Sequence, residues 1–470
     1  MRGDLVGNPS EHLATLSNLK MRAESWLERD PARGKYRIDR EAFTDPAIFE
    51  LEMKYVFERN WIFLGHESQI ANKHDFLTTY IGRFPVIISR DRSGELHGLI
   101  NACAHRGARV CREKAGNRRT FSCPFHGWTY SNSGDLLDVT EESLGAYPPN
   151  FSRDAYGLPK IPRLESYRGF IFGSLSEDVQ SLSDYLAGTK TFIDLMIDQS
   201  LGSELEVLPG STRYTYKGNW KLQVENGLDG YHVGTTHANY VLTVNRRFAG
   251  ESKNDTKTFD AQKWSALNGG FFSFHNGHAV LWNEYANPKD RPSYRIIDQL
   301  NEKYGETRAK WINRSTRNLL LFPNVFLMDQ ASTQIRIVRP IAVDETEVIT
   351  YCIAPVGEDE TARAARIRQY EDFFNASGMA TPDDLTEFNN CQIGFGAGGG
   401  LWNDMSRGAG RWEDGAGKYG GDLGVDAIMS SSHVADEGLY LTIHEEWLDR
   451  MKSAIDAEIA ETEVASRELA

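Results

Sequence analysis

The chain has 470 residues and a mass of 53.0 kDa, enough for two or three domains and a large core. Its hydrophobic content of 40% and its mean hydropathy of −0.48 are typical of a soluble globular protein. The formal net charge is −14, and Lys and Arg form no concentrated run, so the composition argues against nucleic-acid binding.

The sequence predicts neither membrane insertion nor export. The first residues contain no apolar segment of the kind found in signal peptides, and no stretch approaches the roughly 18 apolar residues of a membrane-spanning helix. The cysteines are sparse and odd in number, which does not indicate a disulfide framework. They are Cys103, Cys111, Cys123, Cys352 and Cys391. We therefore expect a cytoplasmic protein with no membrane partner.

Residues 1–57 are expected to form the helical N-terminal part of a larger catalytic domain. In the segment EAFTDPAIFELEMKYVFERNW, the residues Ile48, Leu51, Tyr55 and Val56 recur at helical spacing. This pattern ends where a series of short β segments begins.

Residues 58–177 predict a small all-β domain. Short runs of β-forming residues alternate with turns, as in WIFLGHE, DFLTTYIG and FPVIISRD. Two later runs, HGLINACAH and RTFSCPFHGWTYS, each carry one or more cysteine and histidine residues. We expect these residues to lie in loops at the tips of β-hairpins, where rigid strands can present them.

The two loops carry matching metal-ligand motifs, Cys103-Ala-His105 and Cys123-Pro-Phe-His126. In a Rieske [2Fe–2S] centre two cysteines hold one iron and two histidines hold the other, so each loop contributes one ligand of each kind. The pattern therefore predicts a Rieske cluster held by Cys103, His105, Cys123 and His126.

Zinc is the alternative occupant of such a donor set. Zinc sites also use two Cys and two His, but they usually group the cysteines in one knuckle and the histidines in another. Gly107 and Gly127, which follow the ligands, also suit a cluster, because a missing β-carbon lets backbone N–H groups approach its sulfides. Cys111 is expected to be a buried small apolar residue.

Residues 178–470 predict an α+β domain with an antiparallel sheet flanked by helices, of the helix-grip type. The segments STRYTYKGNWKL, STQIRIVRPI and EVITYCIAP have β-type patterns, whereas ETARAARIRQYEDFFNAS and EEWLDRMKSAIDAEIAETEVAS are helical. The Gly-rich stretch from Gly394 to Gly424 is expected to be a long surface excursion, since its glycines lack the spacing of a phosphate loop.

A second metal site is indicated by the segment NWKLQVENGLDGYHVGTTHANY. Glu225, Asp229 and His232 fall at i, i+4 and i+7, so one helical face would carry all three. His237 follows His232 by five residues, so both can meet one ion only if the helix breaks between them, and Gly234 stands there. Two histidines and a carboxylate form the facial triad of non-haem Fe(II) oxygenases. The alternative is a polar helix with two unrelated histidines.

The carboxylate of this triad cannot be assigned from spacing alone. Neither Glu225 nor Asp229 is preferred, and a second candidate region runs from Thr381 to Glu387. There Thr381 is expected as N-cap and Pro382 as the first helical residue, with Asp384 completing a capping box. Capping and metal ligation both place a carboxylate at this position, so both interpretations stay open.

Taken together, these residues resemble the large (α) subunit of Rieske-type aromatic-ring-hydroxylating dioxygenases, in particular the benzoate, toluate and anthranilate dioxygenase group. The stretch NACAHRGARVCREKAGNRRTFSCPFHGWTYSNSG is similar to the cluster domain of that family, and GNWKLQVENGLDGYHVGTTHANY is similar to its iron-binding segment. The patterns C-x-H…C-x2-H and D-x2-H-x4-H occur in the order typical of the family, and the resemblance covers nearly the whole chain.

The resemblance implies roles for individual residues. His232 and His237 would bind the mononuclear Fe(II), and Asp384 would match the family's third ligand. Asp229 would link His232 to His126 of the partner subunit. The positions that match the lining of the family's substrate pocket are Asn226, Gly227, Gly230, Val233 and Ala380.

The resemblance also implies an activity and its partners. The protein would be a terminal oxygenase component that dihydroxylates an aromatic carboxylate of the benzoate, anthranilate or halobenzoate type, using O₂. Electrons would come from NADH through a separate flavin and iron–sulfur reductase. The subunits would form an α trimer, usually with a small β subunit as α3β3. The alternatives are a Rieske monooxygenase or O-demethylase acting on an acid such as salicylate, a pure electron carrier, and a zinc-binding interaction module.

Overall fold

The computed structural model describes residues 9–249, 268–285, 287–330, 333–398 and 400–468. Contacts divide the chain into two units. The small unit comprises residues 57–185 and 205–207, and the large unit comprises residues 1–56, 186–204 and 208–470. The small unit is thus inserted in the sequence of the large one, as the fold prediction required.

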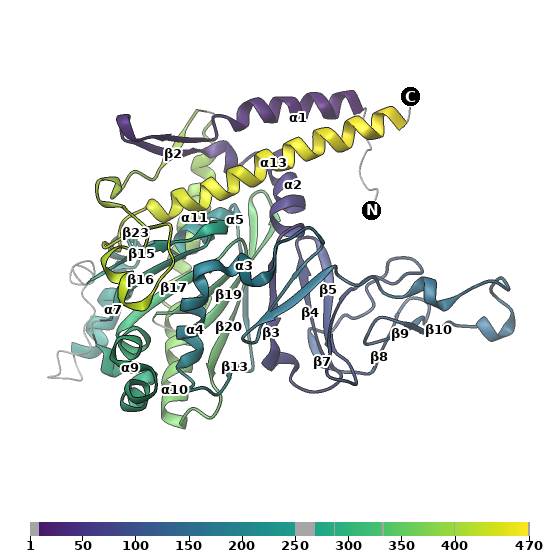
Figure 1. Cartoon of the computed structure of the whole chain (residues 1–470), viewed down its shortest axis with the longest axis horizontal. Coiled ribbons are helices and arrows are strands. Elements are labelled where there is room, and N and C mark those ends of the chain that lie inside the picture. Colours follow the sequence, from purple (N-terminus) through teal and green to yellow (C-terminus); the bar gives the residue numbers. More distant parts are fainter. Residues whose placement is uncertain (1–8, 250–267, 286, 331–332, 399, 469–470) are drawn as a thin grey trace. The chain divides into compact units, whose positions relative to one another are not determined.

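The small unit is built mainly from short antiparallel strands (Figure 1), which confirms the all-β prediction. Four strands form one sheet in the order β6-β5-β4-β7, and two three-stranded sheets have the orders β10-β9-β8 and β11-β12-β3. The strands are β3 (Ile62–His66), β4 (Asp75–Ile81), β5 (Phe84–Arg90), β6 (Leu96–Ile100), β7 (Ala115–Asn117), β8 (Thr120–Ser122), β9 (Thr129–Ser131), β10 (Leu136–Asp138), β11 (Arg163–Tyr167), β12 (Phe170–Ser174) and β13 (Leu205–Val207).

The prediction that both cysteine–histidine loops lie at hairpin tips is half wrong. The loop with Cys123 joins β8 to β9, which pair directly as a hairpin. The loop with Cys103 instead joins β6 to β7, which lie at opposite edges of their sheet because β7 returns to pair with β4. Local β patterns mark strands but not their partners, so the sequence could not separate the two cases.

The large unit contains one long antiparallel sheet with the order β20-β19-β18-β17-β16-β15-β23-β22, and β14 also pairs with β20. Its strands are β14 (Thr212–Tyr216), β15 (Gly269–Ser273), β16 (Ala279–Glu284), β17 (Ser315–Leu321), β18 (Val325–Asp329), β19 (Thr333–Ala342), β20 (Glu345–Pro355), β22 (Glu413–Asp414) and β23 (Met429–Ser431). A separate small sheet holds β1 (Leu27–Asp30), β2 (Lys35–Asp39) and β21 (Trp402–Asp404).

Helices cover both faces of the long sheet. The helices of the large unit are α1 (Pro9–Ala23), α2 (Pro46–Leu51), α4 (Lys190–Asp198), α5 (Trp220–Asn226), α6 (Val233–Thr236), α7 (Ala238–Ala249), α9 (Ile297–Arg314), α10 (Glu360–Gln369), α11 (Thr381–Phe395), α12 (Gly417–Gly420) and α13 (Gly438–Glu468). On β17 the side chain of Arg317 donates to the carbonyl of Trp311 in α9, whereas the next residue, Asn318, donates to the carbonyl of Gly227 after α5. Successive side chains of a strand point to opposite faces, so α9 and α5 lie on opposite sides of the sheet.

The described part of the Gly-rich stretch lies mostly at the surface, as predicted, but it contains short strands that the sequence did not indicate. Within it β21 pairs with β2, and β22 pairs with β23. Its residue 399 lies outside the described residues. A chain rich in glycine can still add short strands to existing sheet edges, because strand pairing uses backbone groups.

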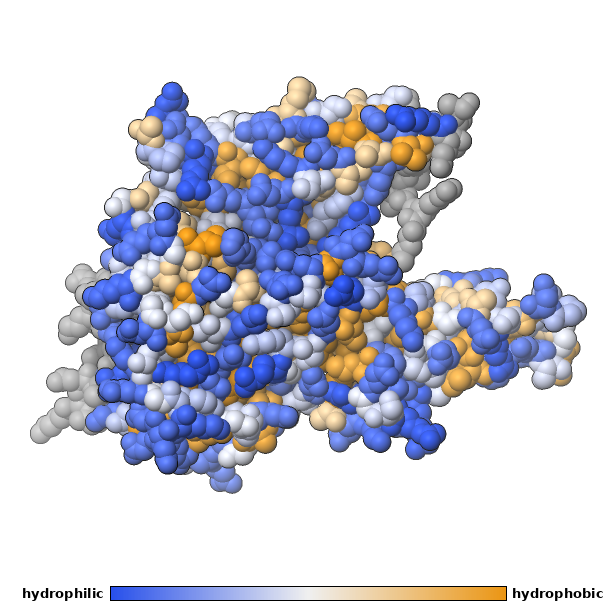
Figure 2. Space-filling model, viewed as in Figure 1, coloured by the Kyte–Doolittle hydropathy of each residue, from blue (hydrophilic) through white to orange (hydrophobic). Residues whose placement is uncertain are grey.

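The surface and the helices agree with the composition. On the face shown in Figure 2, hydrophilic side chains predominate and hydrophobic ones form small groups. Among the described residues, every helix falls short of the combination of length and apolar character that crossing a bilayer demands.

A buried charged network joins four parts of the large unit. A π-helical segment, η3 (Glu52–Glu58), follows α2 and places the Glu52 carboxylate 2.8 Å from Nε1 of Trp220 in α5 and 2.7 Å from Nε1 of Trp447 in α13. The ammonium group of Lys221 also pairs with Glu52 and donates to the carbonyl of Ala42 at 2.7 Å. Burial lowers the pKa of Lys221, although the Glu52 carboxylate opposes that shift. The network therefore fixes α5, which begins the segment with the predicted iron ligands.

We predict that Glu52→Ala destabilises the protein strongly. Removing one partner leaves the buried Lys221 charge and two indole N–H groups unpaired, which typically costs about 3–5 kcal/mol. The free energy of unfolding can be measured by urea titration with tryptophan fluorescence. Lys54→Met is the matched control from the same π-helical segment, since Lys54 is 33% exposed, pairs with Glu458 and Glu461 of α13 and should contribute far less than Glu52. Equal losses in the two variants would contradict the prediction.

Candidate metal centres

The two loops of the small unit have the same backbone conformation. In each, the cysteine N–H donates to the carbonyl five residues later, and the cysteine carbonyl accepts from the glycine N–H four residues later. These bonds are Cys103 N to Ala108 O (2.8 Å), Gly107 N to Cys103 O (2.8 Å), Cys123 N to Trp128 O (2.7 Å) and Gly127 N to Cys123 O (3.0 Å). Both glycines are left-handed, with φ of 72° and 78°, which explains why glycine stands at these two positions.

The two histidines of these loops face each other. Nδ1 of His105 lies 3.1 Å from Nδ1 of His126. The indole ring of Trp128 stacks on His105, with centroids 5.0 Å apart and planes within 9°, and so fixes the orientation of that imidazole. Two imidazole lone pairs at this distance need a proton or a metal cation between them, because otherwise they repel.

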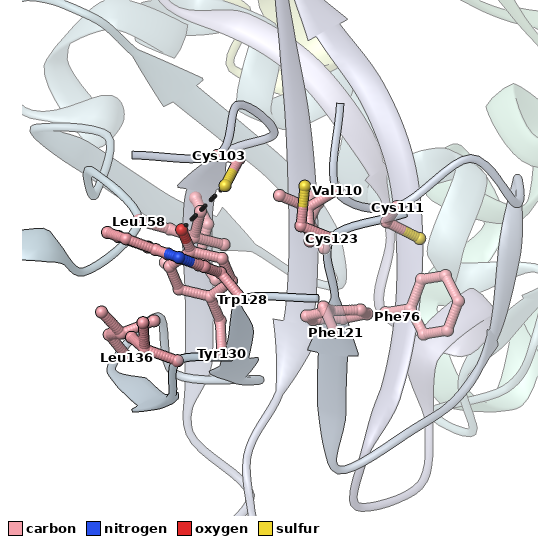
Figure 3. Close-up of a cluster of buried hydrophobic side chains, with 13 residues drawn as sticks. Phe76, Cys103, Val110, Cys111, Phe121, Cys123, Trp128, Tyr130, Leu136 and Leu158 are labelled. Atoms are coloured by element: carbon pink, nitrogen blue, oxygen red, sulfur yellow. Dashed lines mark hydrogen bonds between the residues drawn. The ribbon is translucent and has the colours of Figure 1, made fainter. Parts of the chain in front are cut away.

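The two cysteines lie at the edge of a buried apolar cluster (Figure 3). Cys103 and Cys123 are each 3% exposed, and Phe121, Trp128 and Tyr130 are among the residues packed there. The Tyr130 hydroxyl lies 3.1 Å from Sγ of Cys103 and accepts from the N–H of Ala104 at 3.1 Å. Burial raises the pKa of the Cys103 thiol, so a thiolate here needs a positive partner.

These residues fit a Rieske cluster. Two buried sulfurs and two Nδ1 atoms come from paired loops, and the chemistry of this donor set matches two thiolates on one iron and two imidazoles on the other. The motif spacing did not indicate the supporting residues Trp128 and Tyr130. Both stand in the HGWTYS segment directly after the second histidine, so their aromatic character was the available signal.

The predicted single helical face for Glu225, Asp229 and His232 is wrong. Helix α5 is capped by Asn219, whose side chain accepts from the N–H of Lys221, and it ends at Asn226. Asp229 and His232 lie in the following link, and α6 then spans Val233–Thr236. The chain therefore leaves the helix at Gly227 and not at Gly234, which lies inside α6.

This change of direction brings three predicted ligands together. Nε2 of His232 lies 3.1 Å from Nε2 of His237. Oδ1 of Asp384 lies 3.4 Å from the first nitrogen and 3.3 Å from the second. One ligand atom from each residue lies within 4.8 Å of the others, and His237 and Asp384 are buried. The donor set of two imidazoles and one carboxylate fits a mononuclear Fe(II) site.

The structure separates the two interpretations of Asp384. Helix α11 begins at Thr381, its N-cap is Ala380, and no side-chain hydrogen bond caps it, so the predicted N-cap at Thr381 is wrong. The Asp384 carboxylate points to the histidines and accepts from Nδ2 of Asn226 at 3.2 Å. Sequence rules for capping describe only local backbone and could not include histidines so distant in the chain.

Carboxylates also approach the other nitrogens of the two histidines. Nδ1 of His232 lies 3.3 Å from Oδ2 of Asp229, and Nδ1 of His237 lies 3.6 Å from Oδ2 of Asp383. Burial opposes charge on His232, but Asp229 and Asp384 outweigh it and raise the pKa of His232 to about 10. A divalent cation satisfies the same field in place of a proton.

The five predicted pocket residues have different surroundings. Nδ2 of Asn226 lies 3.4 Å from Nε2 of His232, and Gly227 packs against the ring of Phe326. A β-carbon on Gly230 would come within 2.2 Å of the carbonyl of Val434, so that position is filled by another part of the backbone. Val233, which begins α6, is half-buried, and the fully buried Ala380 precedes α11.

A cavity of about 320 Å³ lies beside Asp229 in the large unit. Its lining includes Arg40, Glu225, Asp229, Glu437 and Tyr440. Burial and the neighbouring Asp229 raise the pKa of Glu437 to about 7. Glu225 does not join the metal-ligand group, because its Oε1 lies 2.7 Å from Nε2 of His444. His444, Glu437 and Tyr440 could not be found from the sequence, because they lie far beyond the histidine motif in the chain.

Comparison with known proteins agrees with both centres. Residues 60–148 match the model of the Rieske [2Fe-2S] domain, and residues 206–454 match that of the ring hydroxylating alpha subunit (catalytic domain). The chain is 50% identical to the 2-halobenzoate 1,2-dioxygenase large subunit of Burkholderia cepacia, covering 92% of this chain and 93% of that protein. It is 50% identical to toluate 1,2-dioxygenase subunit alpha of Pseudomonas putida, covering 93% and 95%.

A solved structure gives the same picture of the fold. Naphthalene 1,2-dioxygenase from Rhodococcus sp., bound to indole, superposes with a TM-score of 0.76 at 26% identity, covering 94% of this chain and 98% of that one. The match of residues 206–454 to a catalytic domain also makes the electron-carrier and zinc-module hypotheses wrong.

We predict that Tyr130→Phe lowers the reduction potential of the cluster. The hydroxyl donates to a sulfur and stabilises the more negative reduced state, so losing a bond of about 1 kcal/mol shifts the potential by on the order of 50 mV. A redox titration followed by electron paramagnetic resonance measures the shift. Tyr147→Phe is the control, since Tyr147 accepts from Nε1 of Trp128 at 3.3 Å and forms no hydrogen bond with Sγ of Cys103 among the described residues. An unchanged potential in the Tyr130 variant would refute the role.

Proposed function

Because the chain belongs to the family of Rieske-type ring-hydroxylating dioxygenase large (α) subunits, we propose that it is a terminal oxygenase that dihydroxylates an aromatic carboxylate. The observation that carries this proposal is the convergence of His232, His237 and Asp384 in a chain that also holds the paired cysteine–histidine loops. The substrate class is supported by two relatives at 50% identity, which are named for 2-halobenzoate and toluate.

The product depends on the ring substituent next to the carboxylate. Addition of both oxygen atoms to benzoate gives a cis-dihydrodiol acid, which keeps the carboxylate. A halogen or amino group at the attacked carbon can leave together with the carboxylate, and the product is then a catechol. The alternative activity is monooxygenation or O-demethylation of a related acid such as salicylate on the same scaffold.

The cluster and the mononuclear iron would have different roles in the reaction. When bound, the cluster at Cys103, His105, Cys123 and His126 supplies single electrons, and Fe(II) at His232, His237 and Asp384 supplies activation of O₂ beside the substrate. The protein residues hold these ligands in place. Asn226 donates to Oδ1 of Asp384, and Trp128 fixes the plane of His105.

Asp229 is proposed to position His232 and to connect it to the source of electrons. Its carboxylate lies 3.3 Å from Nδ1 of His232, so its charge favours a proton on that nitrogen, and Nε2 is then free for the metal. The same side chain lines the cavity described above, which contains none of the three candidate iron ligands among its described lining residues. We propose that Asp229 receives His126 of the partner subunit from that side.

The relatives are components of multi-subunit enzymes, as their names state. We propose an α trimer, combined with a small β subunit as α3β3, and a separate flavin and iron–sulfur reductase that draws electrons from NADH in the cytoplasm. A trimer suits the role of Asp229, since head-to-tail contacts between identical subunits close into a ring.

The reaction is tested by oxygen labelling. With reductase, NADH, benzoate and ¹⁸O₂, we expect both labelled atoms in the diol product. Incorporation of a single labelled atom would favour the monooxygenase alternative, and NADH consumption without an oxygenated acid would reject the proposed substrate class.

The iron ligands are tested by metal analysis. Asp384→Ala should lower the iron content from about three to about two atoms per chain and leave the visible spectrum of the cluster unchanged. Asp383→Ala is the neighbouring control, because its carboxylate approaches only Nδ1 of His237 and should weaken iron affinity by about 10- to 100-fold without abolishing binding. Full iron content in the Asp384 variant would overturn the assignment.

A further inference from the structure

One arginine in the large unit is buried without a hydrogen-bond partner for part of its side chain. Among the described residues, four arginines are buried. Three of them pair with carboxylates: Arg291 and Arg317 with Asp329, and Arg366 with Glu358. The fourth, Arg336, is 2% exposed, and its Nε and Nη2 atoms have no hydrogen-bond partner in the described structure.

Arg336 lies on the face of the sheet that carries the predicted iron segment. In the strand register it stands opposite Phe326 of β18 and Thr350 of β20, so these three side chains share one face. Phe326 is the residue against which Gly227 packs. The guanidinium of Arg336 therefore belongs to the side of the sheet covered by α5.

Two further contacts connect Arg336 to the metal ligands. Its guanidinium carbon lies 4.9 Å from the ring centroid of Phe374. The ring of Phe374 is 4.4 Å from that of Phe373, which lies 6.1 Å from the imidazole of His237. Arg336 and the ligand group are thus separated by one pair of aromatic side chains.

Tyr214 offers a second unpaired donor between the same groups. It stands opposite Val348 on β20, and its hydroxyl is buried without a hydrogen-bond partner among the described residues. Burial raises the pKa of Tyr214, Arg336 lowers it and Asp384 raises it, so both charged groups are close enough to act on the phenol. The hydroxyl stays protonated and can donate.

The unpaired guanidinium of Arg336 and hydroxyl of Tyr214 destabilise the fold unless an anion binds to them. A buried cation with unpaired N–H groups is strongly disfavoured, and the other buried arginines avoid this cost through carboxylates of the protein. A planar guanidinium with two free N–H directions matches a carboxylate, which it can bind in bidentate fashion. A neutral phenol beside it adds a third donor to the same anion.

We propose that Arg336, assisted by the Tyr214 hydroxyl, binds the carboxylate of the aromatic substrate. This inference rests on the proposed function for the identity of the anion, and it adds the residue that distinguishes an aromatic acid from an uncharged arene. Arg336 is a binding residue, since it touches the substrate away from the carbons that react.

Binding measurements test this assignment in the intact, iron-loaded oxidised protein. Equilibrium dialysis compares labelled benzoate with uncharged benzamide. Arg336→Met should raise the Kd for benzoate by about 10- to 100-fold, as expected when a charged hydrogen-bonding partner is lost, and should change the Kd for benzamide far less. Arg336→Lys keeps the charge and should fall between wild type and Arg336→Met.

The matched control is Arg339→Met on the same strand. Arg339 is 23% exposed, pairs with Glu347 at 3.2 Å and lies on the opposite face of β19, so its loss should leave benzoate binding unchanged. The thermal midpoint of Arg336→Met should not fall below that of wild type, because Met replaces an unpaired buried charge by an apolar side chain of similar length.

The outcomes separate this inference from the proposed function. A benzoate Kd that is unchanged in Arg336→Met, or an equal loss for benzoate and benzamide, would overturn the role of Arg336 even if the wild type oxidises benzoate. Selective loss of benzoate binding would support it even if labelling showed monooxygenation.

Discussion

The structure depends on holding three electron-rich atoms within 3.4 Å of one another in a buried place. These atoms are Nε2 of His232, Nε2 of His237 and Oδ1 of Asp384. They come from distant parts of the chain: Asp384 accepts a hydrogen bond from Asn226, which precedes it by 158 residues. Such atoms repel or compete for a proton unless a cation lies among them, so the fold must hold them against that tendency. The surrounding structure must therefore be rigid for these three residues to bind a metal.

That rigidity comes from contacts between α5 and its neighbours. The Glu52 carboxylate anchors the start of α5 through Trp220 and Lys221, far from the metal ligands. The side chain of Gln392 in α11 accepts from the backbone N–H of Asn219, the N-cap of α5, at 2.9 Å. The helix that carries Asp384 is therefore tied to the helix that leads to the histidines, and a buried ion pair that is costly in isolation is used for positioning.

The sequence predicted those parts of the site that depend on residues close together in the chain. The paired cysteine–histidine loops and the strand pattern of the small unit could be read directly, since each rests on residues close together in the chain. The point at which the helix ends could not, because Gly227 and Gly234 both allow it, and the packing of Gly227 against Phe326 involves a distant part of the chain. Asp384 could be read as a capping residue or as a metal ligand, because the histidines that it approaches are distant in the chain. Arg336 could not be singled out at all, since only the pairing of β18, β19 and β20 places it beside the site.

The two candidate centres present opposite nitrogens of their histidines, and this explains how one chain could serve both ends of an electron-transfer contact. In the small unit His105 and His126 direct Nδ1 toward each other, so their Nε2 atoms remain for an outside acceptor. In the large unit His232 directs Nε2 to the ligand group and Nδ1 to Asp229, whose carboxylate also lines a cavity. An imidazole N–H and a carboxylate are complementary partners. In the proposed trimer, a contact of this kind would join different surfaces of identical chains, and the closed ring would give every iron site one cluster.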